Sequence, residues 1–375
     1  MKALHLTGNF EDAGGILSVI RQLQAATQGK GWTHAVFVHR QYVETRQPRL
    51  DYRFSRFVCS EMPSHAGIFW RATLALLEAK RLLAREPFDI IHAHSRCGFL
   101  VGLGLAGWLN RPVLFTNHDY ARRTAMYRRA ANRRNLYTVV LTPNMARHYG
   151  LEERPPRINV ISACCSDRFF TEPLVRQDRA AVEPRTLRLA GVGSLLRWKK
   201  WDLLAEALRQ LNPSERARIE VSVWGPVVQS DPDSPRYESE LRQFIQAHGL
   251  ERQILLRGST TAVSEALRQA DWLILPSTNE PCSVGLIEAL ALGIPALVSA
   301  SGGNVDIVKT GISGCFFEPG NPADLADKLR VLLNAQAAVE APERIRESVR
   351  FRSASSVAEK YDELYRRLVD AKRSR

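Results

Sequence analysis

Short apolar segments alternate with amphipathic helical segments through both halves of the chain, and this alternation limits the fold more than any other feature. Strands that alternate with helices form parallel sheets, whose strands are buried on both faces and read as continuous apolar runs. In the first half, strands are predicted at residues 3–6, 34–39, 89–93, 113–117 and 138–141, with helices at 16–28 and 69–84. In the second half, they are predicted at residues 188–193, 219–224, 254–258, 272–276 and 295–299. We therefore predict an α/β protein with two doubly wound parallel sheets.

The length of 375 residues also suits two domains. A charged segment between Pro173 and Pro184 predicts a linker at 171–186, which separates a first domain at 1–170 from a second at 187–353. A terminal helix at 354–375 is predicted from the helical spacing of Val357, Tyr361, Leu364 and Leu368.

The charge balance predicts an anionic partner. Lysine and arginine number 52 against 39 acidic residues, a formal net charge of +13, which favours a lipid headgroup, a phosphorylated acceptor or nucleic acid. No apolar stretch is long enough to span a bilayer, and the chain begins with a strand rather than a signal peptide, so we expect a cytoplasmic protein. The six cysteines lack C-x-x-C spacing and are predicted to be reduced thiols.

Two glutamates flank the loop between the strand at 272–276 and the next apolar helix. Glu280 should lie beyond the carboxyl end of that strand, where open α/β sheets bind ligands, and Glu288 in or near the first turns of the helix. An acid near a helix start also stabilises the helix dipole without any ligand, but a pair in this framing favours a binding site. Free backbone N–H groups are offered to a phosphate by the helix start at Ser283, Val284, Gly285 and Leu286.

This segment resembles the E-x7-E signature of glycosyltransferase family 4, whose members are retaining, nucleotide-sugar-dependent enzymes of the GT-B fold. The resemblance covers nearly the whole chain in the family's motif order. It implies two Rossmann-like domains facing across a cleft, the first on the acceptor side and the second binding the donor, with the terminal helix crossing back to the first. It further implies that Glu280 lies by the donor sugar and that Glu288 binds the ribose hydroxyls.

A glycine pair and a basic loop resemble two other motifs of the family. Gly14 and Gly15 open the first helix and match the N-terminal glycine loop that reaches the donor, although a tight turn alone would also use glycine. The segment 193–201 resembles G-R-L-x-x-x-K-G, with Lys199 at the Lys position.

Two departures from that basic motif matter. Ser194 replaces its Arg and Lys200 replaces its Gly. A departing diphosphate needs fixed positive charge when no metal is present. We therefore expect Arg197 to supply the missing guanidinium beside Lys199. The segment from Gly302 to Asp306 also resembles the family's G-G-x-x-E turn on the donor side, with Asp306 in place of Glu, and residues 158–163 resemble the family strand at the domain junction.

Histidines follow two strands of the first half. His118 comes directly after the strand at 113–117, and the family carries a His near the donor sugar at this position, so His118 is a candidate catalytic residue. His92 and His94 share one face of the preceding strand, a spacing that also occurs in metal sites. Since no Cys or acidic pair completes a ligand set, we expect no metal and no cofactor.

Residues 102–107 match G-x-G-x-x-G, but they lie inside an apolar helical pattern rather than between a strand and a helix. We interpret these glycines as close-packing positions and do not expect a nicotinamide cofactor. A run of arginines follows His118 and is predicted to share or flank one helical face. On the acceptor side it favours contact with a phosphate-bearing acceptor or an anionic membrane rather than nucleic acid, and its main members are Arg122, Arg123, Arg129 and Arg133.

The sequence therefore predicts a retaining glycosyltransferase that moves a sugar from a nucleotide-diphosphate sugar to a hydroxyl of a glycan, lipid-linked or other acceptor. We expect a role in cell-surface polysaccharide or glycoconjugate synthesis, in the cytoplasm or on the inner face of the membrane. Two alternatives remain open: a nucleotide-sugar 2-epimerase of the same fold, and a non-catalytic protein that binds sugar nucleotides or polyanions.

Overall fold

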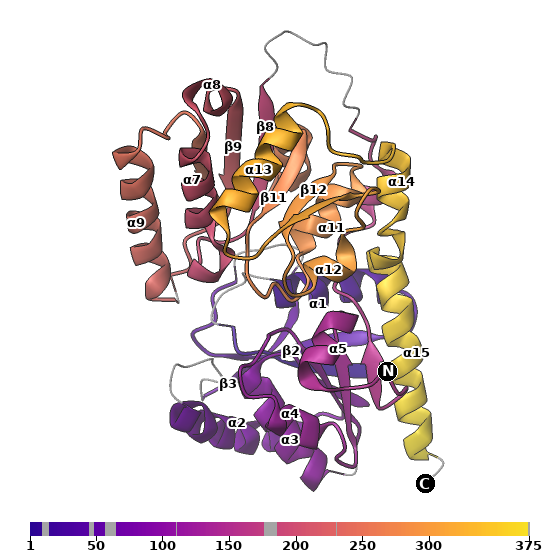
Figure 1. Ribbon diagram of the computed structural model, residues 1–375. Helices are drawn as coiled ribbons and strands as arrows, with labels where there is room; N and C mark the ends of the chain where they lie inside the picture. The colour runs from indigo at the N-terminus through magenta and orange to yellow at the C-terminus, as the bar shows by residue number, and fades with distance from the viewer. Residues whose placement is uncertain are drawn as a thin grey trace. The chain divides into compact units, whose positions relative to one another are not determined.

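The computed structural model describes residues 1–9, 15–44, 49–56, 65–109, 111–175, 186–229 and 231–373. Its contacts divide the chain into two compact units (Figure 1). The N-terminal unit comprises Met1–Cys164 with Ala354–Arg375, and the C-terminal unit comprises Cys165–Ser353. The division thus falls after Cys164, somewhat before the boundary predicted at residue 170, and the final helix is grouped with the first half of the chain.

A seven-stranded parallel sheet forms the centre of the N-terminal unit, in the order β3-β2-β1-β4-β5-β6-β7. Its strands are β1 (Lys2–Leu6), β2 (Thr33–His39), β3 (Asp51–Ser55), β4 (Ile90–Ala93), β5 (Val113–Asn117), β6 (Leu136–Val140) and β7 (Ile158–Val160). The edge strand β3 was not predicted from the sequence. The strand order reverses between β1 and β4, which is the doubly wound arrangement that the alternating pattern predicted.

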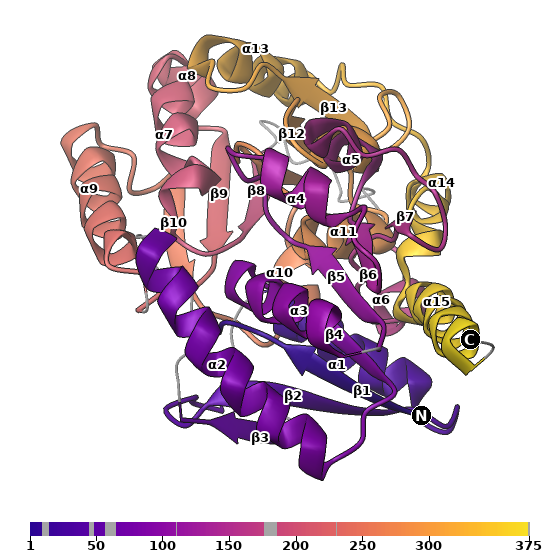
Figure 2. The ribbon, with the colours of Figure 1, turned by 90° about the horizontal axis from the view of Figure 1, so that it is seen from below.

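Helices cover both faces of this sheet (Figure 2). On one face α2 (His65–Arg85) packs against α3 (Arg96–Trp108), and α3 lies on the strands. A Cβ added to Gly102 would lie 3.0 Å from Val113 Cγ1, and one added to Gly104 would lie 2.6 Å from Leu76 Cδ2. Gly102 and Gly104 of the G-x-G-x-x-G match therefore permit close packing of α3, as predicted from the sequence.

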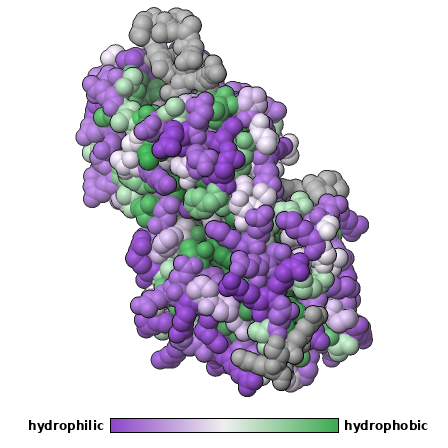
Figure 3. Space-filling view, turned by 90° about the vertical axis from the view of Figure 1, so that its right-hand side faces the viewer, coloured by the Kyte–Doolittle hydropathy of each residue, from purple (hydrophilic) through white to green (hydrophobic). Residues whose placement is uncertain are grey.

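The other face of the sheet carries α1 (Gly15–Thr27) and the terminal helix α15 (Ala354–Arg373), which pack against each other. The inward side of α15 is apolar and aromatic: Tyr361 and Tyr365 are each exposed by 2% or less, and Val357 is fully buried. Burial of side chains this large contributes roughly 1.5–3 kcal/mol each. The opposite side of the helix is charged, and Figure 3, which looks toward the side of the molecule that carries α15, shows a largely hydrophilic surface.

A six-stranded parallel sheet in the order β10-β9-β8-β11-β12-β13 forms the centre of the C-terminal unit. Its strands are β8 (Leu187–Val192), β9 (Ile219–Trp224), β10 (Ile254–Gly258), β11 (Trp272–Leu275), β12 (Ala296–Ser299) and β13 (Gly314–Phe317). The order reverses between β8 and β11, and the edge strand β13 was not predicted. Both sheets therefore follow the predicted doubly wound, all-parallel plan.

Successive residues of β8 identify the helices on its two faces. A Cβ on Gly191 would lie 2.7 Å from Trp201, at the start of α7 (Trp201–Arg209), which packs with α9 (Asp233–Ala247) and α13 (Pro322–Leu333). The next residue, Val192, contacts Gly285 of α11 (Val284–Ala291) on the opposite face. The remaining helices are α4 (Ala125–Ala130), α5 (Pro143–Tyr149), α6 (Arg168–Thr171), η1 (Arg197–Lys199), α8 (Pro213–Arg216), α10 (Val263–Arg268), α12 (Asn304–Ile307), α14 (Pro342–Glu347) and η2 (Arg350–Arg352).

The predicted helical face of arginines is wrong. Helix α4 spans only Ala125–Ala130, so Arg122 and Arg123 precede it, Arg133 follows it, and only Arg129 lies within it. A longer helix would stack like charges one turn apart, which is destabilising.

Among the described residues, no helix is both long enough and apolar enough to cross a membrane.

Candidate functional site

The strand order of the C-terminal unit marks the place where a ligand would bind. Chain connections leave β8 and β11 in opposite directions, which opens a crevice beyond the carboxyl ends of these two neighbours. The loop after β8 leads into η1 and ends with Lys199, and the loop after β11 contains Glu280. The two segments that resemble the family's basic and E-x7-E motifs therefore lie at one switch point, although 81 residues separate Lys199 from Glu280.

Lys199 and Glu280 form a buried ion pair at this point. The Lys199 Nζ donates to Glu280 Oε2 at 2.6 Å, and the two residues are only 8% and 5% exposed. A Cβ at Gly193 would lie 3.2 Å from Lys199 Cε, so the glycine leaves room for the lysine side chain beside the end of β8. Buried charges are costly unless they are paired, and each of these two side chains supplies the partner of the other.

Two neighbouring loops hold the backbone around Glu280. The Gly303 N–H donates to the Glu280 carbonyl at 2.7 Å, and the Thr278 N–H donates to the Trp198 carbonyl at 2.9 Å. Gly302 has a φ of +58°, and a Cβ there would lie 2.6 Å from the Glu280 nitrogen. Only glycine fits this close approach, so the Gly302–Gly303 turn fixes the position of the glutamate.

The helix that follows Glu280 begins with a side-chain cap. Ser283 Oγ accepts the Leu286 N–H at 3.2 Å, so this amide is satisfied within the chain, whereas the first helical amides belong to Val284 and Gly285. Glu288 lies in the second turn of α11 and is partly buried. A Cβ at Gly285 would lie 2.9 Å from Val192 Cγ1, so packing against the sheet alone requires this glycine.

Arg197 is held by two carboxylates of α9. Its Nε donates to Asp233 at 2.9 Å and its Nη1 to Glu240 at 3.0 Å, with about half of each side chain exposed. These hydrogen bonds raise the pKa of Arg197 above its usual value and lower that of Asp233. To take the place of the family Arg that Ser194 replaces, Arg197 would have to exchange these carboxylates for a ligand.

The second departure from the basic motif has a backbone explanation. Lys200 adopts a left-handed conformation, with a φ of 58°, between η1 and α7. This region suits glycine and costs other residues about 1–2 kcal/mol. The left-handed conformation thus explains why the motif has glycine at this position, and Lys200 adopts the same conformation with strain.

Arg352 is a buried cation that the sequence analysis did not identify. It is 4% exposed, and its guanidinium contacts Cys282 Sγ at 3.7 Å and donates to the Asp306 carbonyl at 3.1 Å. Arg352 therefore packs behind the loop between Glu280 and α11. Because 70 residues separate Arg352 from Cys282, no local pattern could have indicated this contact.

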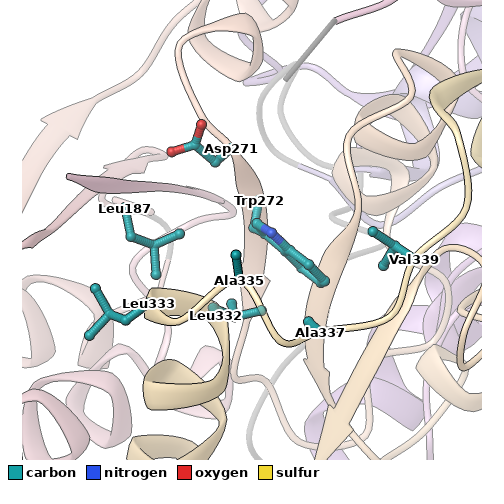
Figure 4. A pocket seen from close by; sticks show the side chains of 8 residues that line it. All are labelled: Leu187, Asp271, Trp272, Leu332, Leu333, Ala335, Ala337 and Val339. Carbon is teal, nitrogen blue, oxygen red and sulfur yellow. The ribbon is translucent and has the colours of Figure 1, made fainter. Parts of the chain in front are cut away.

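A small cavity of about 100 Å³ lies elsewhere in this unit (Figure 4). Its lining includes Leu187 and Trp272, the first residues of β8 and β11, with Asp271 beside them. The cavity therefore lies at the amino ends of β8 and β11. Lys199 and Glu280 lie beyond the opposite, carboxyl ends of the same strands. The Asp271 carboxylate accepts the Arg188 N–H at 2.9 Å and joins the strand starts. This cavity is not the site at the switch point.

The N-terminal unit contains the other predicted site residues. His118 directly follows β5 and is partly buried. Gly15 is the first residue of α1, and no atom of the described residues lies within 4 Å of a Cβ added to it, whereas Gly14 lies outside the described residues.

His118 is the end of a chain of hydrogen-bonded histidines, which we call the histidine chain. Its Nε2 lies 3.2 Å from His94 Nδ1, and His94 Nε2 lies 2.9 Å from His5 Nδ1. His5 Nε2 lies 2.9 Å from His34 Nδ1, and His34 Nε2 lies 2.9 Å from the hydroxyl of Thr27. The strand register places His5 of β1 beside His92 of β4, and the sequence analysis recognised only His92, His94 and His118 of this group.

Burial keeps these rings neutral near pH 7. It lowers the pKa of His34 and His118 to about 4, and it lowers those of His5, His92 and His94 well below the usual value. Charging one ring would also place a cation beside its neighbours.

Nitrogen atoms of His5, His92 and His94 lie within 4.8 Å of one another, a cluster that could hold a metal ion. Both ring nitrogens of each histidine already have hydrogen-bonding partners, however. His92 contacts the Tyr365 hydroxyl at 2.6 Å and Thr116 Oγ1 at 2.7 Å, while His5 and His94 are engaged in the histidine chain. A metal would have to break several of these bonds, so the cluster fits a hydrogen-bond network better.

Comparisons with known proteins agree with this arrangement. The profile described as "Glycosyl transferases group 1" matches residues 178–352, and that described as "Glycosyltransferase Family 4" matches residues 13–163. A D-inositol 3-phosphate glycosyltransferase of Geodermatophilus obscurus is 28% identical over 73% of this chain, and the match spans only 65% of that relative's length. One from Salinispora arenicola is 27% identical over 88% of this chain and 81% of the relative.

Solved structures show the same fold. Sucrose-phosphate synthase from Thermosynechococcus elongatus superimposes with a TM-score of 0.79 at 19% identity and covers 99% of both chains. Anabaena HepE, solved with UDP and glucose, gives a TM-score of 0.74 at 17% identity and covers 97% of this chain and 98% of its own. The two family profiles together span both units of the molecule, so the chain belongs to the group 1, family 4 glycosyltransferases, a retaining family with the GT-B fold.

Proposed function

We propose that this protein transfers a sugar from a nucleotide-diphosphate sugar to a hydroxyl group, with retention at the anomeric carbon. The observation that carries the proposal is the buried pair of Lys199 and Glu280 at the switch point between β8 and β11. A cation and an anion held at a ligand-binding edge of the sheet match the two needs of the donor, which are neutralisation of its diphosphate and recognition of its sugar hydroxyls.

Each residue of this site has a role in the proposal. Lys199 and the first amides of α11, from Val284 and Gly285, stabilise the departing diphosphate. Glu280 accepts hydrogen bonds from the sugar hydroxyls, and Glu288 binds the ribose. In a front-face reaction the bond from the anomeric carbon to the phosphate oxygen breaks, the acceptor oxygen bonds on the same face, and the phosphate oxygen takes the acceptor's proton.

His118 and Gly15 are the proposed contributions of the N-terminal unit, His118 as a hydroxyl-binding group and Gly15 as a close backbone approach to the donor. The exposed Arg122, Arg123, Arg129 and Arg133 support an anionic acceptor. The relatives named as D-inositol 3-phosphate glycosyltransferases make phosphorylated small molecules the first acceptors to test, ahead of lipid-linked glycans. The Arg122→Ala/Arg123→Ala variant should raise the KM for a phosphorylated acceptor and leave that of a neutral one unchanged.

The proposal is tested by measuring nucleotide release from UDP, GDP, ADP and dTDP sugars in the presence of an extract that contains acceptors. We expect wild-type protein to release nucleotide, and we expect Glu280→Gln to lower kcat/KM by on the order of 100-fold, as loss of one transition-state contact does elsewhere. Glu238→Gln is the matched control, because Glu238 belongs to the same unit but pairs with Arg242 on the exposed face of α9.

The outcomes separate the alternatives. Conversion of the donor sugar without any acceptor would identify an epimerase, and donor binding without turnover would identify a binding protein. Equal activity of Glu280→Gln and wild type would remove Glu280 from the site.

Arg197 is tested separately. If Lys199 alone supplies the fixed positive charge, Arg197→Ala will leave the affinity for UDP within about twofold of wild type. A tenfold loss, about 1.4 kcal/mol, would show that Arg197 leaves Asp233 and Glu240 to bind the diphosphate.

A further inference from the structure

The histidine chain ends at the hydroxyl of Thr27, whose single hydrogen is already used in another hydrogen bond. Thr27 is 4% exposed, and its hydroxyl donates to the Leu23 carbonyl at 2.7 Å, within α1. A hydroxyl has one hydrogen to donate, so Thr27 Oγ1 must accept the hydrogen bond from His34 Nε2.

This single constraint propagates through the chain. A neutral imidazole carries one N–H, so a hydrogen on His34 Nε2 leaves His34 Nδ1 as an acceptor, which takes the hydrogen of His5 Nε2. By the same argument His5 Nδ1 takes the hydrogen of His94 Nε2, and His94 Nδ1 takes that of His118 Nε2. All four rings therefore carry their hydrogen on Nε2.

We propose that the chain Thr27–His34–His5–His94 fixes the tautomer of His118, so that His118 presents Nδ1 as a hydrogen-bond acceptor to a hydroxyl of the bound ligand. Nδ1 of His118 is the one ring nitrogen of the histidine chain that has no partner in the part of the protein that the structure describes. His94, His5, His34 and Thr27 are positioning residues, because they act on the ligand only through His118. The inference rests on the proposed function for the identity of the ligand as a sugar or acceptor hydroxyl, but the tautomer itself does not depend on it.

The opposite polarity is the physical alternative. If the Thr27 hydroxyl turned to donate to His34, every ring would carry its hydrogen on Nδ1, and His118 would become a donor to the ligand. That arrangement gives up the hydrogen bond from Thr27 to Leu23. The helical carbonyl therefore selects the first polarity, and the neutral state of the rings, maintained by burial, lets the selection pass along the chain.

The test uses full-length protein labelled with ¹⁵N at histidine, without ligand at pH 7.5, with the signal of His118 assigned from a His118→Asn variant. We expect the protonated and bare nitrogens of His118 to be Nε2 and Nδ1, respectively. The Thr27→Val variant should lose this preference and Thr27→Ser should restore it. Thr73→Val is the matched control, because Thr73 makes the same hydroxyl bond to the carbonyl four residues earlier, at 2.9 Å to Phe69, at an exposed position of α2 that is not part of the histidine chain.

Activity provides a second readout if the transferase proposal holds. Thr27→Val should lower kcat about tenfold, the effect of one hydrogen bond in the transition state, while Thr27→Ser and Thr73→Val stay near wild type. A protein with no transferase activity but with the Nε2 tautomer at His118 would refute the proposed function and leave the tautomer inference standing.

Three results would overturn the inference: a hydrogen on Nδ1 of His118 in wild type, an unchanged tautomer in folded Thr27→Val, or stoichiometric Zn²⁺ binding that shifts the signals of His5, His92 and His94. The last result would make the cluster a metal site.

Discussion

The ion pair of Lys199 and Glu280 makes a quantitative prediction about stability. At the 2.6 Å separation of Nζ and Oε2, and with an effective dielectric constant of about 20, the attraction is about 6 kcal/mol. Removing each ion from water costs several kcal/mol, so the pair as a whole is expected to stabilise the protein little. Removal of one partner leaves the other charge buried alone, which costs about 3–5 kcal/mol.

A double-mutant cycle with Lys199→Met and Glu280→Met separates these terms. We expect each single variant to lower the free energy of unfolding of the C-terminal unit by about 3–5 kcal/mol, and the double variant by no more than about 2 kcal/mol, because it buries two apolar side chains of similar size. Additive effects would predict about 6–10 kcal/mol for the double variant, so the two expectations are well separated.

Urea unfolding followed by tryptophan fluorescence measures this cycle. Four of the seven tryptophans lie in the C-terminal unit, namely Trp198, Trp201, Trp224 and Trp272. The control is the exposed pair of Arg242 and Glu238 on α9, for which a coupling energy below about 0.5 kcal/mol is expected. Additive losses at Lys199 and Glu280 would refute the reasoning, since they would show that the two charges do not compensate each other.

Three further predictions concern backbone strain, packing and acid. Lys200→Gly should raise the midpoint of thermal unfolding by about 1–3 °C, because it relieves the left-handed φ of 58°, whereas Lys200→Ala should not raise it. Gly285→Ala should destabilise the protein by about 1–3 kcal/mol in urea unfolding through overlap with Val192. Val192→Ala in the same chain should recover only part of this loss, because it removes Cγ1 at 2.9 Å but keeps the Val192 Cβ at 3.0 Å. A Gly285→Ala variant as stable as wild type would contradict the packing argument. Acidification from pH 6.5 to about 4 should destabilise the N-terminal unit by up to about 1.4 kcal/mol per pH unit for each buried neutral histidine. The reason is that histidines of the unfolded chain bind protons in this range, whereas the folded rings do not, since the pKa values of His34 and His118 are about 4 in the folded protein. Unfolding free energies at pH 7.5, 6.5 and 5.5 measure this slope, and a slope of less than one proton would count against a neutral histidine chain.

The fold could be predicted because the central strands are buried on both faces and read as apolar runs. The two strands that were missed, β3 and β13, lie at sheet edges. In β3, Asp51 and Phe54 are exposed, and β13 begins with a glycine, so neither segment has the apolar pattern of a central strand. The helix predicted for the arginine segment was wrong for a different reason. Helical spacing alone takes no account of the repulsion between like charges that lie one turn apart.

Contacts within the candidate site were only partly accessible from the sequence. Glu280, Ser283 and Glu288 belong to one segment whose strand and helix framing is local. The pairing of Glu280 with Lys199 depends on the switch point, which is a property of the strand order. The sequence did not indicate a role for Thr27, His5 or His34. Single histidines are common on strands, and only the strand register brings His5 beside His34 and His92.

The two departures from the basic motif show that one motif combines two kinds of requirement. The glycine that Lys200 replaces is required by the left-handed backbone conformation. A lysine can adopt this conformation at a cost of about 1–2 kcal/mol, since it is strained but allowed. The arginine that Ser194 replaces supplies a positive charge, which no change of backbone conformation restores. Ser194 accepts a hydrogen bond from Trp201 Nε1 through its carbonyl at 3.3 Å, so its backbone still serves the loop. The missing charge must then be supplied by Lys199, by Arg197 after it leaves its two carboxylates, or by a lower demand of this donor, and the affinity of Arg197→Ala for UDP distinguishes the second case from the others.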